Sequence, residues 1–266
     1  VREMTRSNGP LKEAAQQLLA TWGRGRAVVT SDVAEPANFI QARDRGVAVL
    51  TDFDNARVAL ETLRAQLPTT TDPAAKADLE SKIALSEQVL RTSPIEAMRW
   101  FERALTLADN ETPPEDLAIV RRYMAYLHFV EGRPYQAATI GEFQLVTDPT
   151  GAGSRASGSI ALNAYWTLYQ QAPEQDRTFE IEHLRNVADR LIDGFPETDE
   201  AIRAANLMAF VSLAAGDLEA ARSYLAAIPE TAPERTRTRL MIGTRIFGDY
   251  LRELSRIGAD RRAGTI

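Results

Sequence analysis

The feature of this sequence that most constrains its fold is a pattern that occurs twice. An amphipathic segment is followed by a glycine, then by an alanine five residues later and by a proline twelve residues after that. Glycine favours a tight turn at the end of a helix, and alanine lets two helices pack closely. The pattern therefore predicts a repeated helical hairpin, whose marker positions are Gly132, Ala137 and Pro149 in one copy and Gly216, Ala221 and Pro233 in the other.

The rest of the chain has the same helical character. Apolar side chains recur three and four residues apart in most segments, which is the period of an amphipathic helix. Residues 28–30 resemble a strand, but so short a run has no partner to pair with, and residues 26–35 are expected to be a loop. We therefore predict an all-α chain of roughly eleven helices, joined by turns that carry helix-capping residues.

Three helices are predicted in the N-terminal region. The first covers about residues 10–22, and a longer one covers residues 36–67, where Gly46 is expected to bend or break it. Asp72 is placed to cap a third helix, whose apolar stripe covers residues 79–90. The second and third helices should form an antiparallel hairpin. It would either project as a coiled-coil arm or pack on the rest of the chain, and its broad apolar stripe favours packing.

Further helix starts are predicted from capping sequences, in which a Ser or Thr is followed three residues later by a Glu. These sequences are residues 93–96, 112–115 and 231–234. Other helices should begin at Asp176 and after Thr198, and the last helix should cover residues 232–257. The small-residue segment 150–158 lacks the Lys-Ser/Thr of a phosphate-binding P-loop, so we expect a linker there rather than a phosphate cradle.

The hairpin pattern resembles the tetratricopeptide repeat, a helical hairpin of about 34 residues with small residues and proline at fixed offsets. Four segments between residues 79 and 233 resemble it: 79–105, 131–138, 160–196 and 215–225. Equivalent positions are 40, 47 and 37 residues apart, at Ala97, Ala137, Leu184 and Ala221. Each spacing exceeds the 34 residues of the family, so the array resembles a degenerate set of such repeats of bacterial type. The segment 195–198, followed by a capped helix, also resembles helical lipoproteins and envelope adaptors of bacteria.

The resemblance implies an α-α superhelical solenoid, in which hairpins stack because one hairpin cannot bury its own apolar face. Residues 1–92 would form a helical region with an extra hairpin that packs on or leads into the array, and residues 93–266 the repeats with a C-terminal capping helix. The first helices of stacked hairpins line a concave groove. By the family's offsets, the second repeat would line the groove with Ile119, Arg122, Tyr126 and Phe129, and the fourth with Arg203, Asn206, Phe210 and Leu213. Residues of the third repeat, whose register is left open, would join them: Asn163, Tyr165 and Tyr169.

A groove with arginine, asparagine and aromatic side chains suits an extended peptide, whose backbone takes hydrogen bonds and whose side chains fill apolar pockets. The resemblance therefore implies a non-enzymatic scaffold that binds a peptide segment or a partner protein. The alternative for Tyr126 and Phe210 is a place in the core. Two other functions stay open: a sensor or regulatory module that closes on a small molecule, and a non-catalytic part of a larger enzyme or envelope assembly.

Composition and charge limit the classes of partner and the compartment that we expect for this chain. A net charge of −6 over 266 residues argues against a nucleic-acid surface, which usually needs a basic excess. No apolar run of about 18 residues is present to cross a bilayer. The chain has no cysteine, which excludes thiolate zinc sites and favours an oxidising compartment, the bacterial envelope or periplasm, over the cytoplasm. The sequence begins at Val1 rather than Met, which leaves room for a leader or a preceding region.

No catalytic residue, cofactor site or metal site is predicted. His128 and His183 are the only histidines, and neither has a second histidine three or four residues away, which disfavours a metal site. Two acidic pairs are expected on solvated helix faces: Asp52 with Asp54, and Glu180 with Glu182. The arginine-rich C-terminal segment, residues 235–262, is also expected to be a solvated face rather than a site for an acidic partner.

The last predicted helix carries a heptad stripe, whose members are Leu240, Gly243, Phe247, Tyr250, Leu254 and Ile257. Ile242, Ile246 and Leu251 widen the apolar side beyond what one preceding hairpin needs, and Gly243 and Gly248 would let another helix approach. We expect the stripe to pack either on the N-terminal helices of the same chain, as a monomer, or on a second copy, as a homodimer. The monomeric packing is favoured.

Overall fold

The computed structural model describes residues 36–151 and 153–263, with residues 258–263 described through their backbone alone. The helix expected at residues 10–22 and the loop at 26–35 lie outside this part. The described residues form nine α-helices and two short 3-10 helices, with no strand, which confirms the all-α prediction. The α-helices are α2 (Phe39–Gln66), α3 (Pro73–Leu107), α4 (Pro114–Val130), α5 (Pro134–Thr147), α6 (Ser154–Gln171), α7 (Thr178–Gly194), α8 (Asp199–Ala214), α9 (Leu218–Ala227) and α10 (Pro233–Ala263).

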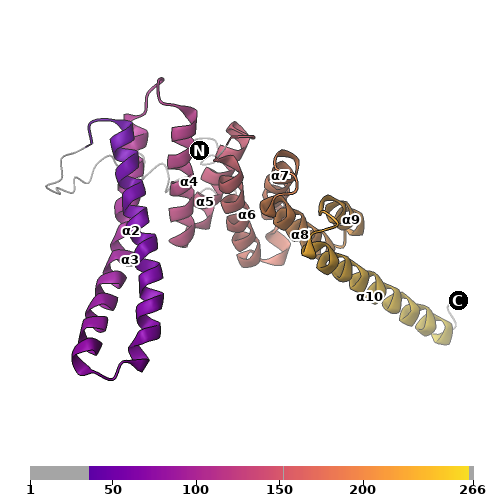
Figure 1. Cartoon of the computed structure of the whole chain (residues 1–266). Coiled ribbons are helices and arrows are strands. Elements are labelled where there is room, and N and C mark those ends of the chain that lie inside the picture. The colour runs from indigo at the N-terminus through magenta and orange to yellow at the C-terminus, as the bar shows by residue number, and fades with distance from the viewer. Residues whose placement is uncertain (1–35, 152, 264–266) are drawn as a thin grey trace. The chain divides into compact units, whose positions relative to one another are not determined.

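The chain divides into two compact units, Val1–Ile140 and Gly141–Ile266, with the division inside α5. In the first unit α2 and α3 lie side by side as the predicted hairpin (Figure 1). The 3-10 helix Leu67–Thr69 begins its turn, and the Asp72 side chain then caps α3 by accepting a hydrogen bond from the Ala75 N–H at 2.9 Å. The hairpin and its cap are therefore confirmed.

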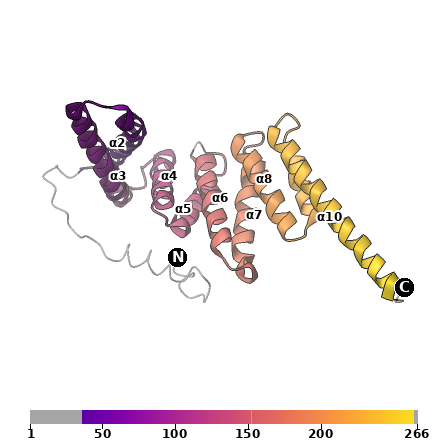
Figure 2. The same cartoon turned by 90° about the horizontal axis from the view of Figure 1, so that it is seen from below.

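The far half of this hairpin packs mainly on itself. Leu60 is the only buried side chain between residues 51 and 92, whereas the other buried residues of α2 and α3 lie at 39–50 and 93–104. The far half extends past the end of α4 in Figure 1, and Figure 2 shows the same hairpin nearly end-on. Of the two alternatives for the hairpin, this half matches the projecting arm as far as the described residues of the first unit go.

The core of the first unit forms where the near ends of α2 and α3 meet α4. Phe101 lies at its centre with no exposed surface, among Phe39, Leu50, Val120 and Leu127. The ring of Phe101 also stacks on Tyr123 of α4, with 5.6 Å between ring centroids. This core holds the hairpin to α4.

Two predicted helix boundaries in the hairpin are wrong. Helix α2 is continuous through Gly46, and α3 is continuous through Pro94, so no helix begins at residues 93–96 and the proposed division at residue 92 falls inside α3. Residues 79–90 and 96–105 are consequently parts of one helix rather than two helices of a repeat. A proline inside a helix removes one backbone hydrogen bond. Here Ser93, Pro94 and Ala97 are buried, and their packing offsets that loss.

The capping sequence at residues 112–115 acts differently from the prediction. Helix α4 begins at Pro114, and its N-cap residue, Pro113, makes no side-chain capping hydrogen bond. The Thr112 hydroxyl instead accepts a hydrogen bond from the Asp109 N–H at 2.9 Å and donates one to the Asp109 carboxylate at 3.0 Å. Thr112 therefore closes the turn between α3 and α4 rather than the first turn of α4.

The two predicted hairpin turns have the same backbone structure. Gly132 and Gly216 both have a positive φ, of 72° and 82°, which glycine adopts without strain. The N–H after each glycine bonds to the carbonyl five residues before it, from Arg133 to His128 and from Asp217 to Ser212, at 2.8 Å in both cases. This is the Schellman arrangement of a helix C-terminus. The repeated turn is confirmed.

Small residues bring α5, α6 and α7 together in the second unit. A Cβ at Gly141 would lie 2.5 Å from the Ser157 carbonyl oxygen, and one at Gly158 would lie 2.9 Å from the side chain of Leu191. Helix α6 begins at Ser154, so the prediction of a linker over residues 150–158 is wrong for its second half. These small side chains permit close helix packing.

Helices α6 to α10 pack in sequence. Each contacts the next along the chain, and α6 also contacts α8, as α8 contacts α10. The predicted cap of α8 is confirmed by a 3.4 Å hydrogen bond from the Ala201 N–H to the Thr198 hydroxyl. Two boundaries differ from the prediction, because a 3-10 helix, Glu174–Asp176, precedes α7 and because α10 extends to Ala263.

Candidate functional site

Three polar side chains join α5, α6 and α7 in the second unit. The hydroxyl of Tyr165 donates a hydrogen bond to Glu142 Oε2 at 2.5 Å, and Nδ1 of His183 lies 2.9 Å from the same oxygen. The rings of Tyr165 and His183 stack with 5.0 Å between centroids, and Phe179 lies 4.3 Å from the His183 ring. The Glu142 carboxylate of α5 is therefore hydrogen-bonded to Tyr165 of α6 and to His183 of α7.

The electrostatics of this cluster follow from burial and from the shared carboxylate. Burial, followed by the charge of Glu142 and the hydrogen bond to it, raises the pKa of Tyr165. For His183, burial alone would lower the pKa, but the hydrogen bond to Glu142 and its charge, with Glu182 and Glu180, raise it overall. Tyr165 therefore stays protonated, and His183 is favoured as an imidazolium.

The cluster is better suited to holding helices together than to proton transfer. Glu142 already accepts from one neutral donor and faces one cationic partner, so it is not free to take a proton from a substrate. Tyr165 is almost completely buried, which separates its hydroxyl from solvent. We therefore interpret the cluster as a structural connection between three helices.

Glu180, in the first turn of α7, was predicted to lie on a solvated helix face, and this prediction is wrong. It is buried, whereas Glu182, Asp52 and Asp54 are exposed as expected. Its Oε2 atom has no hydrogen-bond partner among the described residues. The positive end of the α7 dipole favours a carboxylate in this turn. The spacing of Glu180 and Glu182 places them on different sides of a helix, but it does not say which side is covered.

A cluster of aromatic side chains forms on α6 and α8, and we name Trp166, Tyr169 and Phe210 the aromatic surface. Trp166 stacks on Tyr169 with 5.2 Å between centroids, and it meets Phe210 edge to face at 5.8 Å. The guanidinium of Arg177 lies 4.7 Å from the Tyr169 ring centroid. Tyr169 is buried beneath the others, whereas Phe210 is 44% exposed. The surface therefore offers an apolar edge to solvent beside a cation.

The predicted groove residues of the second unit separate into two groups. Asn163, Arg203 and Phe210 are exposed, and Tyr169 joins Phe210 through Trp166. Three others face the interior, because Tyr165 bonds to Glu142, Leu213 is buried in a core cluster, and Asn206 accepts a 2.7 Å hydrogen bond from the Thr238 hydroxyl of α10.

The predicted groove residues of the first unit, Ile119, Arg122, Tyr126 and Phe129, are all half-buried on α4. The Arg122 guanidinium lies 4.8 Å from the ring centroid of its neighbour Tyr123. Burial and then the charge of Asp54 raise the pKa of Tyr126, with Arg57 acting in the opposite direction, which places its hydroxyl near α2. These side chains do not form an aromatic cluster like that on α6 and α8.

Sequence reasoning missed four residues that organise these features: Glu142, Trp166, Arg177 and His183. Trp166 and Tyr169 are three residues apart on a helix, so their side-by-side position was accessible from spacing. Glu142, Arg177 and His183 had no comparable signal. Each contacts a residue on another helix or segment, and those pairings depend on tertiary packing.

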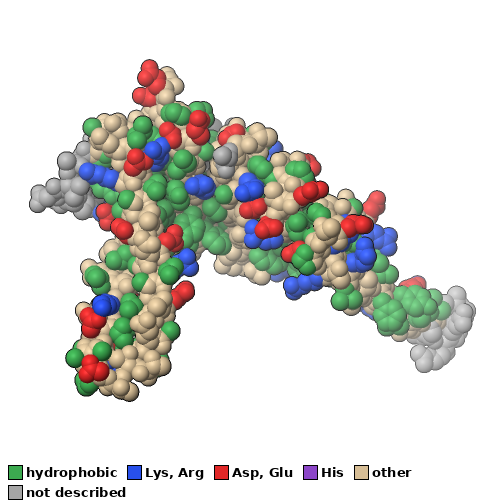
Figure 3. Space-filling view, in the orientation of Figure 1, with side chains coloured by type: hydrophobic (Ala, Val, Ile, Leu, Met, Phe, Trp, Pro, Cys, Tyr) green, Lys and Arg blue, Asp and Glu red, His purple; other side chains and the backbone are tan. Residues whose placement is uncertain are grey.

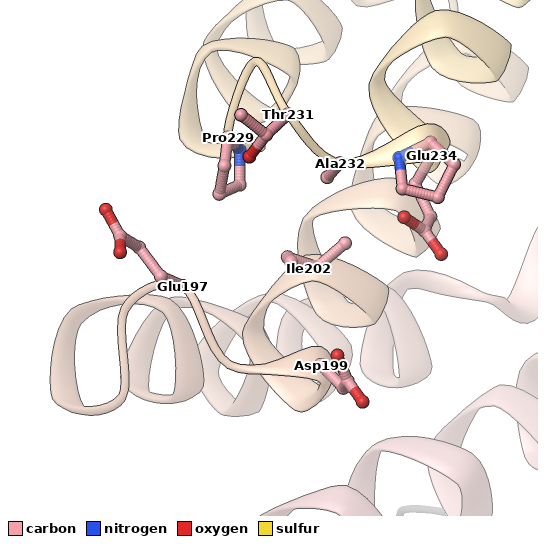
Figure 4. Close-up of a pocket in the computed structure, with 8 residues that line it drawn as sticks. Glu197, Asp199, Ile202, Pro229, Thr231, Ala232 and Glu234 are labelled. Atoms are coloured by element: carbon pink, nitrogen blue, oxygen red, sulfur yellow. The ribbon is translucent and has the colours of Figure 1, made fainter.

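A pocket of about 390 Å³ lies apart from both features, between the loop before α8 and the turn before α10. Figure 4 shows Glu197 on one side of its opening and Pro229 and Thr231 on the other. Asp199 and Glu234 also line the pocket, and none of the predicted site residues does. Its acidic lining differs from the arginine, asparagine and aromatic set expected for a peptide groove.

Within the described part of the chain, no group of three or more His, Cys, Asp or Glu side chains is arranged to hold a metal ion. None of the helices described is both long and apolar enough to cross a lipid bilayer. A scan against protein-family models and searches of curated proteins and of solved structures found no match to this chain.

Proposed function

We propose that this chain is a non-enzymatic scaffold for protein-protein interaction, and that it binds a peptide segment of a partner through the aromatic surface. The observation that carries the proposal is the edge-to-face pair of Trp166 and Phe210 on two neighbouring helices, in which Phe210 is 44% exposed and Trp166 is half-buried. Exposed aromatic side chains set among polar groups are typical of binding hot spots.

A tetratricopeptide-like solenoid is the architecture that we propose for the scaffold. The matching turns at Gly132 and Gly216 support it, because α4 is joined to α5, and α8 to α9, by the same backbone hydrogen bonds around a glycine of positive φ. The contacts of α6 with α8 and of α8 with α10 also support it, since stacked hairpins meet through helices two apart in sequence. The array would begin at α4, because α3 is a single long helix.

The surroundings of the aromatic surface suit an extended peptide. Asn163 and Arg203 are exposed on the same two helices, and both side chains can hydrogen-bond to a peptide backbone or to an acidic side chain. Arg203 has only a long contact of 3.9 Å to Glu200, so little is lost when it turns to a ligand. Phe210 would supply the apolar anchor.

Site-specific cross-linking tests the proposal. A photoreactive phenylalanine analogue is placed at Asn163 and, in a matched control, at Leu85, which is 63% exposed on α3. Partners captured from cells that express the chain are identified by mass spectrometry, and the captured segment is then titrated as a synthetic peptide. We expect Phe210→Ala to weaken peptide binding by at least about tenfold, and Leu85→Ala to leave it unchanged.

Two outcomes would count against the proposal. One is equal capture of the same proteins from positions 163 and 85. The other is a peptide that binds the Phe210→Ala variant as tightly as it binds the parent chain.

A further inference from the structure

The outer part of α10 exposes a stripe of large apolar side chains. Figure 3 shows hydrophobic side chains gathered near its outer end. The exposed fractions are 70% for Leu240, 36% for Ile246, 60% for Phe247, 58% for Tyr250, 46% for Leu251 and 46% for Leu254. With about 200 Å² for each large side chain, this is roughly 600 Å² of apolar surface, more than scattered exposure accounts for.

The stripe lies on a different side of α10 from the residues that hold the helix to its own unit. Thr238 and Ile242 are buried, with Ile242 packed in a cluster that also contains Leu213 and Ala221. At 100° per residue, the stripe is centred roughly 130° around the helix from this buried side. The contacts that anchor α10 on α8 and α9 therefore leave the stripe uncovered.

Most of the charge beside the stripe is paired within α10 itself. The charged residues on the outer part of α10 form ion pairs within the helix, from Arg245 and Arg252 to Asp249 and from Arg256 to Glu253. These pairs leave the flanks of the stripe with a small net positive charge, because three arginines face two carboxylates. An identical helix therefore meets only weak repulsion along these flanks, and a strongly basic partner is disfavoured.

We infer that the stripe is a homodimer interface, in which α10 pairs antiparallel with α10 of a second copy. Pairing across a two-fold axis between Phe247 and Tyr250 sets Phe247 against Tyr250 of the other copy. The same register sets Leu254 against Gly243 and Leu240 against Ile257. Each layer then combines residues whose sizes fit, whereas a parallel pair would oppose Gly243 to itself and leave a hole.

Among the described residues, Gly243 makes no close helix contact that would require a glycine. A Cβ at this position would meet nothing within 4 Å, although glycine inside a helix costs about 0.5–1 kcal/mol relative to alanine. The antiparallel pair supplies a reason, because Leu254 of the other copy occupies that space. Two stripes together would bury roughly 1,200 Å², the lower end of the range for specific interfaces.

The test is the mass of the full chain in solution, measured by light scattering and by sedimentation over a range of concentrations. We expect a dimer, and we expect Phe247→Glu to give a folded monomer with an unchanged helical circular dichroism spectrum. Val58→Glu is the matched control, since Val58 is 58% exposed on α2, and it should stay dimeric. A parent chain that is monomeric at every concentration would overturn the inference, whatever covers the stripe in that case.

The antiparallel orientation of the two α10 helices can be tested separately. Gly243→Leu should weaken the dimer at least about tenfold by clashing with Leu254 of the other copy, and adding Leu254→Ala should restore it. Because the chain has no cysteine, a Phe247→Cys chain mixed with a Tyr250→Cys chain should form the mixed disulfide in preference to either symmetric one. Preference for the symmetric disulfides would overturn the antiparallel arrangement, as would tighter association of Gly243→Leu alone.

Discussion

Gly46 and Phe101 are packed so closely that a Cβ at position 46 would lie 2.5 Å from Cε1 of the Phe101 ring. Phe101 is completely buried at the centre of the first core, so its ring has little room to move. The glycine is therefore required for the packing of α2 on α3, although it lies inside a continuous helix.

Gly46→Ala should destabilise the protein by about 1–3 kcal/mol, since an overpacked core has to shift. The matched control is Gly248→Ala on α10, where a Cβ meets nothing within 4 Å. It should be neutral or stabilising by up to about 1 kcal/mol because alanine favours the helix. Urea denaturation of both variants measures the difference. A Gly46→Ala chain as stable as the control would show that α2 and α3 are farther apart.

Tyr165→Phe should destabilise the second unit by about 1–2 kcal/mol, because it removes the hydrogen bond to the Glu142 carboxylate and leaves a partly buried charge with one donor fewer. Tyr169→Phe on the same helix is the control, since its hydroxyl has no hydrogen bond among the described residues, and it should change stability little. Thermal melting compares the two. Equal effects would mean that Tyr165 contributes through its ring alone.

Stability should fall in mild acid because of His128. Burial, and then the positive charge of Arg133, lower the pKa of His128 from 6.5 to about 4. The unfolded chain therefore binds this proton more readily, so the contribution is full above pH 6.5 and is lost as the pH falls toward 4. Between pH 7 and pH 4.5 the expected loss is about 2–3 kcal/mol. Urea denaturation of the parent and of His128→Leu at both pH values measures it.

His183 should change the pH dependence of stability in the opposite direction to His128, so it serves as a control. Its pKa is raised in the folded chain, so its stabilisation is present below its unfolded pKa and is lost as the pH rises through the folded value. His183→Gln should therefore steepen the loss of stability in acid, whereas His128→Leu should flatten it. Parallel profiles for both variants would contradict the opposite environments of the two histidines.

Asn206→Ala should loosen the attachment of α10. Its side chain accepts the hydrogen bond of the buried Thr238 hydroxyl, so we expect a loss of about 1–2 kcal/mol and faster amide exchange in α10. Asn163→Ala is the matched control, because Asn163 is exposed and its loss should leave exchange unchanged. If Asn206 served a ligand groove alone, the two variants would behave alike without a ligand.

The candidate site was only partly accessible from the sequence. The expected groove included Tyr169 and Phe210, which the structure joins through Trp166, and it included Asn163 and Arg203, which are exposed. The same expected groove also included Tyr165 and Asn206, which face other helices. Offsets say which residues share a face of one helix, but the neighbouring helix decides whether that face is covered.

Local sequence determined those features that depend on backbone groups a few residues apart. The helical period of the apolar residues, the caps at Asp72 and Thr198, and the left-handed glycine turns at Gly132 and Gly216 all belong to this class. Each is governed by hydrogen bonds that close within about one helical turn. Such features could therefore be predicted without knowing what packs against them.

Tertiary structure alone decided the features that depend on remote partners. Packing kept α3 continuous through Pro94 and made Gly46 a contact for Phe101 rather than a bend. Packing also buried Glu180 and left the α10 stripe exposed. The physical reason is that burial free energy depends on which apolar surfaces meet, and residues far apart in the sequence supply those surfaces. A spacing pattern identifies an apolar face, but only the folded chain shows what covers it.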